Sequence, residues 1–338
     1  MIDLIISSVF AFLIGIFVVR KAIVFLKNVG FVGKDVHKED MPLVAEMGGL
    51  PVVIAFIAGI LFFIGFNTAT SKTVDLPVLF ASLLTIIIIM LVGMLDDMTS
   101  LMKKKGKNSD VMKNHKRIGF KQHHKFLLPL PAAIPLMVLN IGVSEMRFPI
   151  FGNVDIGLLY PLIVIPLAVF GASNATNMLA GLNGLEAGLG VVLISSLGLF
   201  SLINGSYTAA VIAFIFVSIL LAFLIYNKYP SKIFPGDSLT YTIGAVAAVV
   251  AVSGNIEKFA VFCFIPWFLE FALKARNMFR AENFGILKSN GKLKNQYSKV
   301  YSLVHAVMEL GNFSEKQIVW IIICFEILVC GFTFAMYL

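Results

Sequence analysis

Long apolar runs alternate with short polar segments along almost the whole chain. A helix needs about 20 mostly apolar residues to cross the hydrocarbon core of a membrane, so runs of this length predict membrane-spanning helices. The ten candidates are residues 3–20, 48–66, 76–95, 127–142, 156–173, 185–203, 207–226, 238–254, 258–273 and 317–337. We expect an all-α integral membrane protein, a single polytopic domain over residues 1–338 with about ten transmembrane helices.

The fourth and ninth runs are the least regular of the ten. The fourth run contains Pro129, Pro131 and Pro135, and the ninth contains Pro266 and Glu270. Helices in a bilayer tolerate proline because neighbouring groups satisfy the freed carbonyls. Both runs therefore remain candidate spans.

The composition argues against soluble domains. Apolar residues make up 59% of the chain and charged residues 14%, whereas soluble domains are nearer half apolar and a quarter charged. The three cysteines all lie in apolar runs without any paired spacing, so we predict neither disulfides nor a zinc site.

Positive charges predict the topology. If the ten helices alternate in direction, the loops on one side hold 24 of the 27 Lys and Arg residues, and only Lys72, Arg147 and Lys258 lie on the other side. Basic loops stay in the cytoplasm, so both termini are expected outside. The same charge would attract phosphate groups and anionic lipid. Nucleic acid is not an expected partner, because the chain has no soluble basic domain.

The first two inward loops carry carboxylates next to apolar runs. Glu46 precedes Gly48 and Gly49, a glycine pair that lets the backbone approach a ligand or another helix closely. Asp96 and Asp97 end an apolar run, where the dipole of a helix C-terminus disfavours acidic side chains. We therefore expect these two aspartates to serve a divalent cation or a proton transfer.

The third inward loop reads NATNMLAGLNGLEAG, residues 174–188. Asn174 and Asn177 would share one face of a helical turn. Burying an unpaired amide costs roughly 2–7 kcal/mol, so these side chains need partners. Asn183 could cap the following helix, but capping does not account for all three asparagines. Amide oxygens suit a hard cation, and amide edges suit a nucleobase.

Three further cations and an acidic turn complete the inward face. Lys125, at the start of the fourth run, suits a phosphate, although it could also simply reach toward the membrane interface. Asp237 follows Phe234-Pro235-Gly236 and could cap a helix. Arg276 and Arg280 are four residues apart and suit bidentate phosphate contacts, or anchor the loop in the cytoplasm.

These residues together indicate one kind of chemistry. Mg²⁺ commonly binds through one or two carboxylates together with substrate phosphates, and flanking cations neutralise charge on a transferring phosphate. The sequence therefore predicts phosphoryl-type transfer at a membrane surface that depends on Mg²⁺, with Mn²⁺ as an alternative ion.

The order of the motifs resembles that of the polyprenyl-phosphate N-acetylhexosamine-1-phosphate transferases. The motifs are LDD at 95–97, HHKFLLP at 123–129, NATNMLAGLNGLEAG at 174–188, YPSKIFPGDS at 229–238 and NGKL at 290–293. The resemblance covers roughly residues 30–310 and is closest to the branch that starts N-linked glycosylation. It implies transfer of N-acetylglucosamine-1-phosphate from a UDP-sugar donor to a polyprenyl (dolichyl) phosphate acceptor, with release of UMP.

The resemblance also implies a role for each candidate residue. Asn177 and Asp237 would bind the metal. The implied catalytic residues, which would hold phosphate and orient or deprotonate the acceptor, are Asp96, Asp97 and Lys125. The implied substrate-binding residues, with Phe234 stacking on the uracil, are Glu46, Gly181, Asn183, Phe234, Arg276 and Arg280.

The last inward loop departs from the family pattern. It contains no histidine before His305, whereas the branch that transfers phospho-N-acetylmuramoyl-pentapeptide has a histidine cluster there, so that donor is not expected. The Arg-His-Arg cluster of the eukaryotic branch is also missing, which leaves the choice between Arg276 and Arg280 open. The compact loop indicates an archaeal member in the cell membrane; a eukaryotic member would lie in the endoplasmic reticulum membrane.

Several alternatives stay open at this point. The same chemistry could use another UDP-N-acetylhexosamine or an undecaprenyl acceptor, and the chain could form a homodimer. A secondary transporter is the alternative from a different class, favoured by Glu270 and Glu326 within apolar runs. Transporters carry internal repeats and polar groups at the membrane midplane, whereas here the polar groups gather at one face and no repeat is visible.

Overall fold

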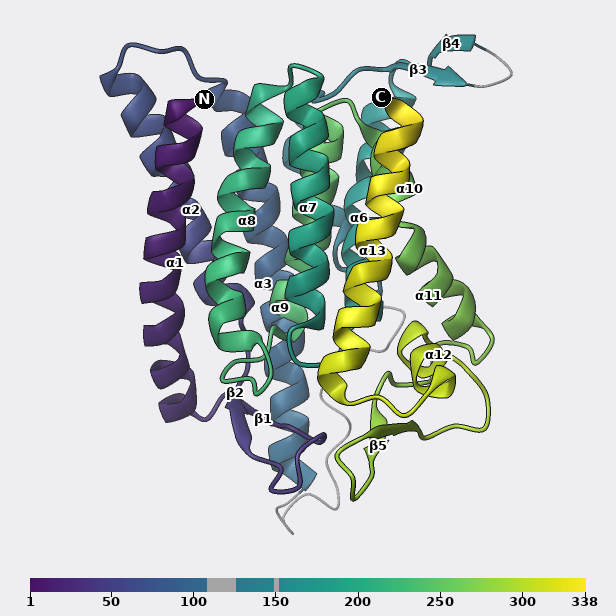
Figure 1. Cartoon of the computed structure of the whole chain (residues 1–338). Coiled ribbons are helices and arrows are strands. Elements are labelled where there is room, and N and C mark those ends of the chain that lie inside the picture. Colours follow the sequence, from purple (N-terminus) through teal and green to yellow (C-terminus); the bar gives the residue numbers. More distant parts are fainter. Residues whose placement is uncertain (108–125, 149–151) are drawn as a thin grey trace.

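The computed structural model of the chain describes residues 1–107, 126–148 and 152–338. It is a bundle of helices with three short antiparallel hairpins, which confirms the all-α fold class (Figure 1). Eight helices in the described residues are long and apolar enough to span a membrane. Seven of them are α1 (Ile2–Val29), α2 (Gly49–Ala69), α3 (Leu76–Lys107), α7 (Leu185–Ile203), α8 (Tyr207–Asn227), α9 (Gly236–Ser253) and α13 (Glu315–Tyr337). The eighth joins a π-helical turn, η3 (Tyr160–Val164), to α6 (Ile165–Met178).

The fourth and ninth runs fold as broken helices. The fourth run becomes a 3₁₀ turn, η2 (Leu130–Ala133), followed by the short α5 (Ile134–Val138). The ninth run divides at Phe264 into α10 (Glu257–Cys263) and α11 (Ile265–Ala275). Proline has no N–H to continue the helical ladder, which explains why these runs are not among the eight long helices.

Helices α1 and α3 extend furthest beyond their apolar runs. The first run was expected to end at residue 20, but α1 continues to Val29 and ends at Gly30, whose φ of 83° is left-handed. The third was expected to end at residue 95, but α3 continues to Lys107. Charged residues do not interrupt a helix whose backbone hydrogen bonds stay satisfied, so the apolar run marks only its minimum length.

Helix α9 lies at the centre of the bundle. In its apolar window 83% of the residues are buried, the largest share of any of the eight helices, and α3, α6, α7 and α8 pack around it. A Cβ added to Gly244 would lie 2.2 Å from the carbonyl oxygen of Ala172. The backbones of α9 and α6 therefore touch, as small residues allow in membrane helix packing.

Two of the three hairpins lie at the end of the bundle opposite to the termini, and the third lies at the same end as the termini. Both termini lie at one end, together with β3 (Glu145–Phe148) and β4 (Gly152–Asp155) (Figure 1). At the other end are the pair β1 (Val32–Lys34) and β2 (Leu43–Ala45), and β5 (Gly285–Leu287), which pairs with β6 (Leu293–Asn295). The short helix α12 (Leu303–Leu310) follows this last hairpin.

Candidate active site

A cavity of about 470 Å³ lies at the end of the bundle that carries β1 and β5. Its size is within the range of pockets that hold small ligands. Its walls come from loops that are far apart in the sequence. They are residues 33–37, Glu46, 177–178, 180–183, Glu186, Asn227, 234–237, Thr240, Lys274 and 281–284.

Six of the residues predicted for the site line this cavity. They are Glu46, Asn177, Gly181, Asn183, Phe234 and Asp237. The third and fourth inward loops and the end of the first therefore meet at one place, as the sequence predicts for a single site. The polar side chains among them are carboxylates and amides, those of Glu46, Asn177, Asn183 and Asp237.

Backbone contacts hold Phe234 in the wall. Its N–H donates to the Ala45 carbonyl at 2.7 Å, and its own carbonyl accepts the N–H of Gly48 at 3.0 Å. A Cβ on Gly33 would lie 3.2 Å from the Phe234 ring and 2.7 Å from Glu46 Oε2. The Phe234 ring and the Glu46 carboxylate are thus packed side by side over β1, where the chain leaves no room for a larger residue.

Asn177 and Asp237 are brought together through Thr240. The Thr240 hydroxyl donates to Asn177 Oδ1 at 2.8 Å and lies 3.2 Å from the Asp237 carbonyl oxygen. An amide oxygen and a carboxylate on one cavity wall form a hard oxygen donor set, the kind that Mg²⁺ prefers when substrate phosphates supply further ligands. These residues therefore fit the predicted metal.

Asp97 holds the start of α9. Its Oδ1 accepts the N–H of Asp237 at 2.6 Å and its Oδ2 accepts the N–H of Ser238 at 3.1 Å. The first N–H groups of a helix lack partners within the helix, and negative charge is favourable there. Asp97 therefore positions Asp237 by satisfying the first turn of its helix.

The prediction that Asp96 and Asp97 end a helix is wrong, because α3 continues to Lys107. The two aspartates are therefore not placed against the dipole of a helix C-terminus. Asp97 instead makes a favourable contact with the N-terminus of α9. Asp96 is 3% exposed and accepts a hydrogen bond from the Thr99 hydroxyl at Oδ1, 3.4 Å away. Neither aspartate is among the residues that line the cavity.

The NATNMLAGLNGLEAG loop is stabilised from within. Asn174 donates to the carbonyls of Phe126 and Phe170, so it links two helical segments outside the cavity. Glu186 Oε1 accepts the N–H of Gly181 at 2.6 Å. The N-cap of α7 is Gly184, so the prediction that Asn183 caps this helix is wrong.

The predicted cations are placed differently from the six lining residues. Arg276 is exposed and donates to the Val300 carbonyl at 3.4 Å, and Arg280 is also exposed. Neither is among the cavity-lining residues. Lys125, like His123 and His124, lies outside the described residues.

Two lysines that the sequence did not predict for the site, Lys34 and Lys274, line the cavity, and Lys274 is the less exposed of them. Lys274 Nζ donates to the Met178 carbonyl at 2.6 Å and lies 3.4 Å from Glu270 Oε1. The spacing of four residues between Glu270 and Lys274 on a helix is a signal for such a pair. Glu270 also accepts the N–H of Leu303, so this acid supports the cavity wall and does not favour a transport pathway.

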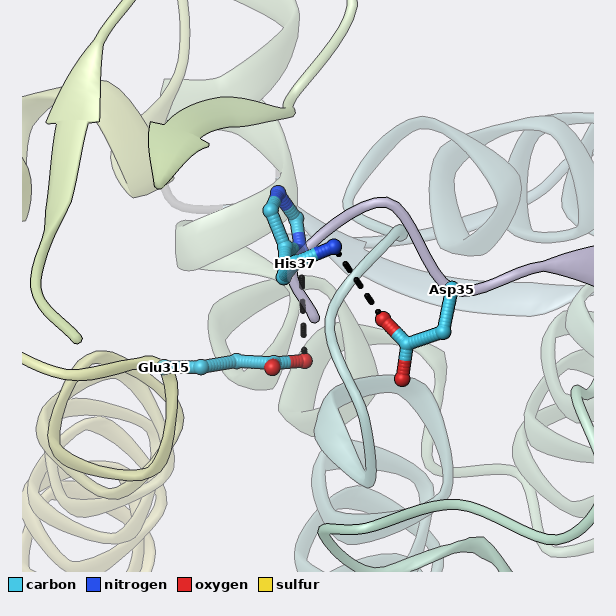
Figure 2. A group of neighbouring side chains, drawn as sticks. All are labelled: Asp35, His37 and Glu315. Atoms are coloured by element: carbon cyan, nitrogen blue, oxygen red, sulfur yellow. Dashed lines mark hydrogen bonds and ion pairs between the residues drawn. The ribbon is translucent and has the colours of Figure 1, made fainter. Parts of the chain in front are cut away.

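Two acids and a histidine form a group at the edge of the cavity, and two of the three, Asp35 and His37, line it (Figure 2). Asp35, His37 and Glu315 are buried, and one ligand atom of each lies within 4.8 Å of the others. His37 Nε2 accepts the N–H of Gly285 at 3.2 Å, and burial lowers the pKa of His37. The imidazole is therefore neutral near pH 7, with its proton on Nδ1, 4.0 Å from Glu315 Oε1.

Comparison with known proteins assigns the chain to a family. Residues 79–255 match glycosyl transferase family 4. This match covers the LDD, NATNM and PGD motifs and more than half of the chain. The chain belongs to glycosyl transferase family 4. The resemblance inferred from the motifs is thereby confirmed at the level of the family.

Relatives of the family share most of the chain's length. A protein of Saccharolobus solfataricus is 34% identical over 95% of this chain and 92% of its own length. One of Sulfolobus acidocaldarius is 33% identical over 97% and 94%. Both are provisionally named UDP-N-acetylglucosamine–dolichyl-phosphate N-acetylglucosaminephosphotransferase. A Dictyostelium discoideum protein of that name is 26% identical over 87% of this chain and 78% of its own.

Proposed function

We propose that the protein transfers N-acetylglucosamine-1-phosphate from UDP-N-acetylglucosamine to a polyprenyl phosphate such as dolichyl phosphate. UMP is the second product, and the lipid-linked sugar would begin oligosaccharide assembly for N-glycosylation. The observation that carries this proposal is the meeting of Asn177, Asn183, Phe234 and Asp237 in one cavity of a family 4 chain. The names of the relatives support the choice of donor and acceptor.

The donor would lie with its uracil against Phe234. An aromatic ring held by backbone hydrogen bonds on both sides offers a fixed stacking surface. Gly181 and Asn183 lie in the same cavity and present a backbone and an amide edge to the base. Glu46, packed beside Phe234, would meet the ribose of the nucleoside.

The pyrophosphate would extend toward α9. Asn177 and Asp237 would hold Mg²⁺, or Mn²⁺ in its place, and this ion would neutralise the developing charge on the donor phosphates. Lys274 is among the lining residues and would contribute a second positive charge. Lys125, Arg276 and Arg280 remain predicted phosphate contacts.

The reaction would join the lipid phosphate to the donor. An oxygen of the polyprenyl phosphate would attack the β-phosphorus, and the bond from that phosphorus to the oxygen that bridges it to the α-phosphate would break. Both oxygens of Asp97 already accept N–H groups of α9. We therefore assign a positioning role to Asp97, and contact of Asp96 with the acceptor phosphate remains a prediction from the resemblance.

The acceptor places the site at a membrane surface. Eight helices are apolar enough to cross a membrane, so a lipid tail can remain in the bilayer while its phosphate reaches the cavity. We propose that the cavity faces the cytoplasm, because the loops at this end of the bundle carry most of the basic residues. A cytoplasmic site also meets the soluble UDP-sugar.

The test is an assay with purified membranes, radiolabelled UDP-N-acetylglucosamine, polyprenyl phosphate and Mg²⁺. We expect label in the organic phase in proportion to UMP, loss of both with EDTA, and recovery with added Mg²⁺. Asn177→Ala and Asp237→Asn should lower turnover by at least 100-fold, about 2.7 kcal/mol in the activation barrier. Asn204→Ala, an exposed amide at the other end of α7, is the control. The proposal would be refuted if the wild type produced no label in the organic phase, either with UDP-N-acetylglucosamine or with other UDP-N-acetylhexosamines.

A further inference from the structure

A buried lysine joins the acids beside the cavity. Lys38 Nζ donates to Glu315 Oε2 at 2.6 Å and lies 3.3 Å from Asp35 Oδ2. The three side chains are 11%, 4% and 5% exposed, respectively. A cation already occupies the space between these carboxylates, so the group formed with His37 is an ion-pair network and not a second metal site.

The same two carboxylates hold Asn183. Its side-chain Nδ2 donates to Asp35 Oδ2 at 2.8 Å, and its backbone N–H donates to Glu315 Oε1 at 2.8 Å. In the sequence, Asn183 is 148 positions from Asp35 and 132 positions from Glu315. Asn183 is therefore fixed by contacts from the first inward loop and from the start of α13.

The Asp35 contact determines which way the Asn183 amide faces. An ionised carboxylate only accepts hydrogen bonds, so the NH₂ group must point to Asp35. The remaining polar atom of the side chain is the carbonyl Oδ1, and no hydrogen bond within the described part of the chain engages it. Because Asn183 lines the cavity, it offers the cavity an acceptor.

We propose that the Asp35–Lys38–Glu315 network is a positioning device that selects the base of the donor nucleotide. The fixed carbonyl of Asn183 would accept the ring N3–H of uracil. Cytosine presents an acceptor at the same ring position, so its complex would leave two acceptors facing each other without a proton. A site built around one hydrogen bond strongly rejects an analogue that cannot form it. This inference rests on the proposed function for the nucleotide in the cavity.

Two members of the network act from outside the cavity. Lys38 and Glu315 are not among the lining residues, whereas Asp35 and Asn183 are. Removing one partner of a buried ion pair leaves the other charge without compensation, and the freed carboxylate would draw Asn183 or its loop away. A change at Lys38 or Glu315 should therefore alter nucleotide selection without any direct contact with the nucleotide.

The experiment compares binding of UMP and CMP to the purified full-length protein by calorimetry, which does not require turnover. Glu315→Gln and Lys38→Met should lower the preference for UMP over CMP at least tenfold. Asp35→Asn should do the same, because an amide at this position can accept or donate and allows Asn183 to turn over. In turnover assays these variants should raise the KM for the UDP-sugar with kcat changed by less than about threefold.

The matched control is Lys316→Met. Lys316 neighbours Glu315 and lies over the same Tyr229 ring as Lys38, at 4.7 Å against 3.8 Å, but it is exposed and belongs to none of the ion pairs in the described residues. Lys316→Met removes one positive charge, as Lys38→Met does, and should leave the preference for UMP over CMP unchanged. If a single variant does not fold, the double variant Lys38→Met/Glu315→Gln removes both charges together and takes its place.

The outcomes separate this inference from the proposed function. Variants that fold and keep the wild-type preference for UMP would overturn the inference, and so would a wild type that binds UMP and CMP equally. A wild type that prefers UMP but makes no lipid-linked product would refute the proposed function alone. A tenfold loss of preference in the network variants, with Lys316→Met unchanged, supports the positioning role.

Discussion

Replacing Asp97 by asparagine tests whether this residue positions α9 or acts on the substrate. Its two oxygens accept N–H groups of Asp237 and Ser238 at 2.6 and 3.1 Å. Asparagine offers one oxygen, so at least one N–H loses its partner, which costs about 1.5–3 kcal/mol for a bond to a charged group. Loss of negative charge at a helix N-terminus adds up to about 2 kcal/mol. We expect a total destabilisation of about 2–5 kcal/mol.

The assay is thermal unfolding of the purified protein, together with turnover at increasing Mg²⁺. One kcal/mol corresponds to roughly 2–4 °C in Tm for domains of 150–250 residues, so Asp97→Asn should lower Tm by several degrees and raise the Mg²⁺ requirement. Asp96→Asn is the comparison, because Asp96 accepts from the Thr99 hydroxyl of its own helix; it should lose turnover with a smaller change in Tm. An Asp97→Asn variant with the wild-type Tm and the wild-type Mg²⁺ requirement would refute the positioning role.

Three further substitutions probe the packing around the site. Thr240→Val removes the hydroxyl that contacts Asn177 Oδ1 and the Asp237 carbonyl oxygen. The Mg²⁺ concentration for half-maximal turnover should then rise roughly 10–100-fold. Thr242→Val loses only a bond to Ser238 and should not change this concentration. Gly244→Ala places a Cβ 2.2 Å from the Ala172 carbonyl, and should cost about 1–3 kcal/mol in unfolding free energy, against no change for Gly171→Ala, where a Cβ meets nothing within 4 Å. Lys274→Met leaves Glu270 buried without its cation and should lower the free energy of unfolding by about 3–5 kcal/mol. Adding Glu270→Gln should restore stability but not turnover. Restored turnover in the double variant would exclude Lys274 from the site.

The sequence predicted the helices best where the apolar run and the turn signals coincide. Residues 185–203 were predicted as a span and form α7 with the same bounds, because Gly184 precedes the run and Asn204-Gly205 follows it. The ends of α1 and α3 were missed, since a helix can continue beyond the membrane without apolar residues. Pro266 made the ninth run uncertain, and the chain indeed breaks beside it.

The site could be predicted only in part, because some of its residues carry no local signal. Asn177 and Asp237 stand out as polar residues beside apolar runs, and both line the cavity. Glu315 begins an ordinary helix, and only its contact with Lys38, 277 positions away, shows what it does. Charge alone suggested Arg276 and Arg280, yet neither lines the cavity. Lys274 does, because a buried acid one turn earlier holds it in place.

The contact between Lys38 and Glu315 also bears on how the protein is made. Domains form from the N-terminus during synthesis, and contacts between distant positions form late because loop closure comes first. Lys38 can pair with Asp35 in its own loop, but its contact with Glu315 must wait until α13 has entered the bundle. A nascent chain that has not yet inserted this helix would lack the Glu315 contact that holds Asn183, so we expect the proposed base selection to begin only when membrane insertion is finished.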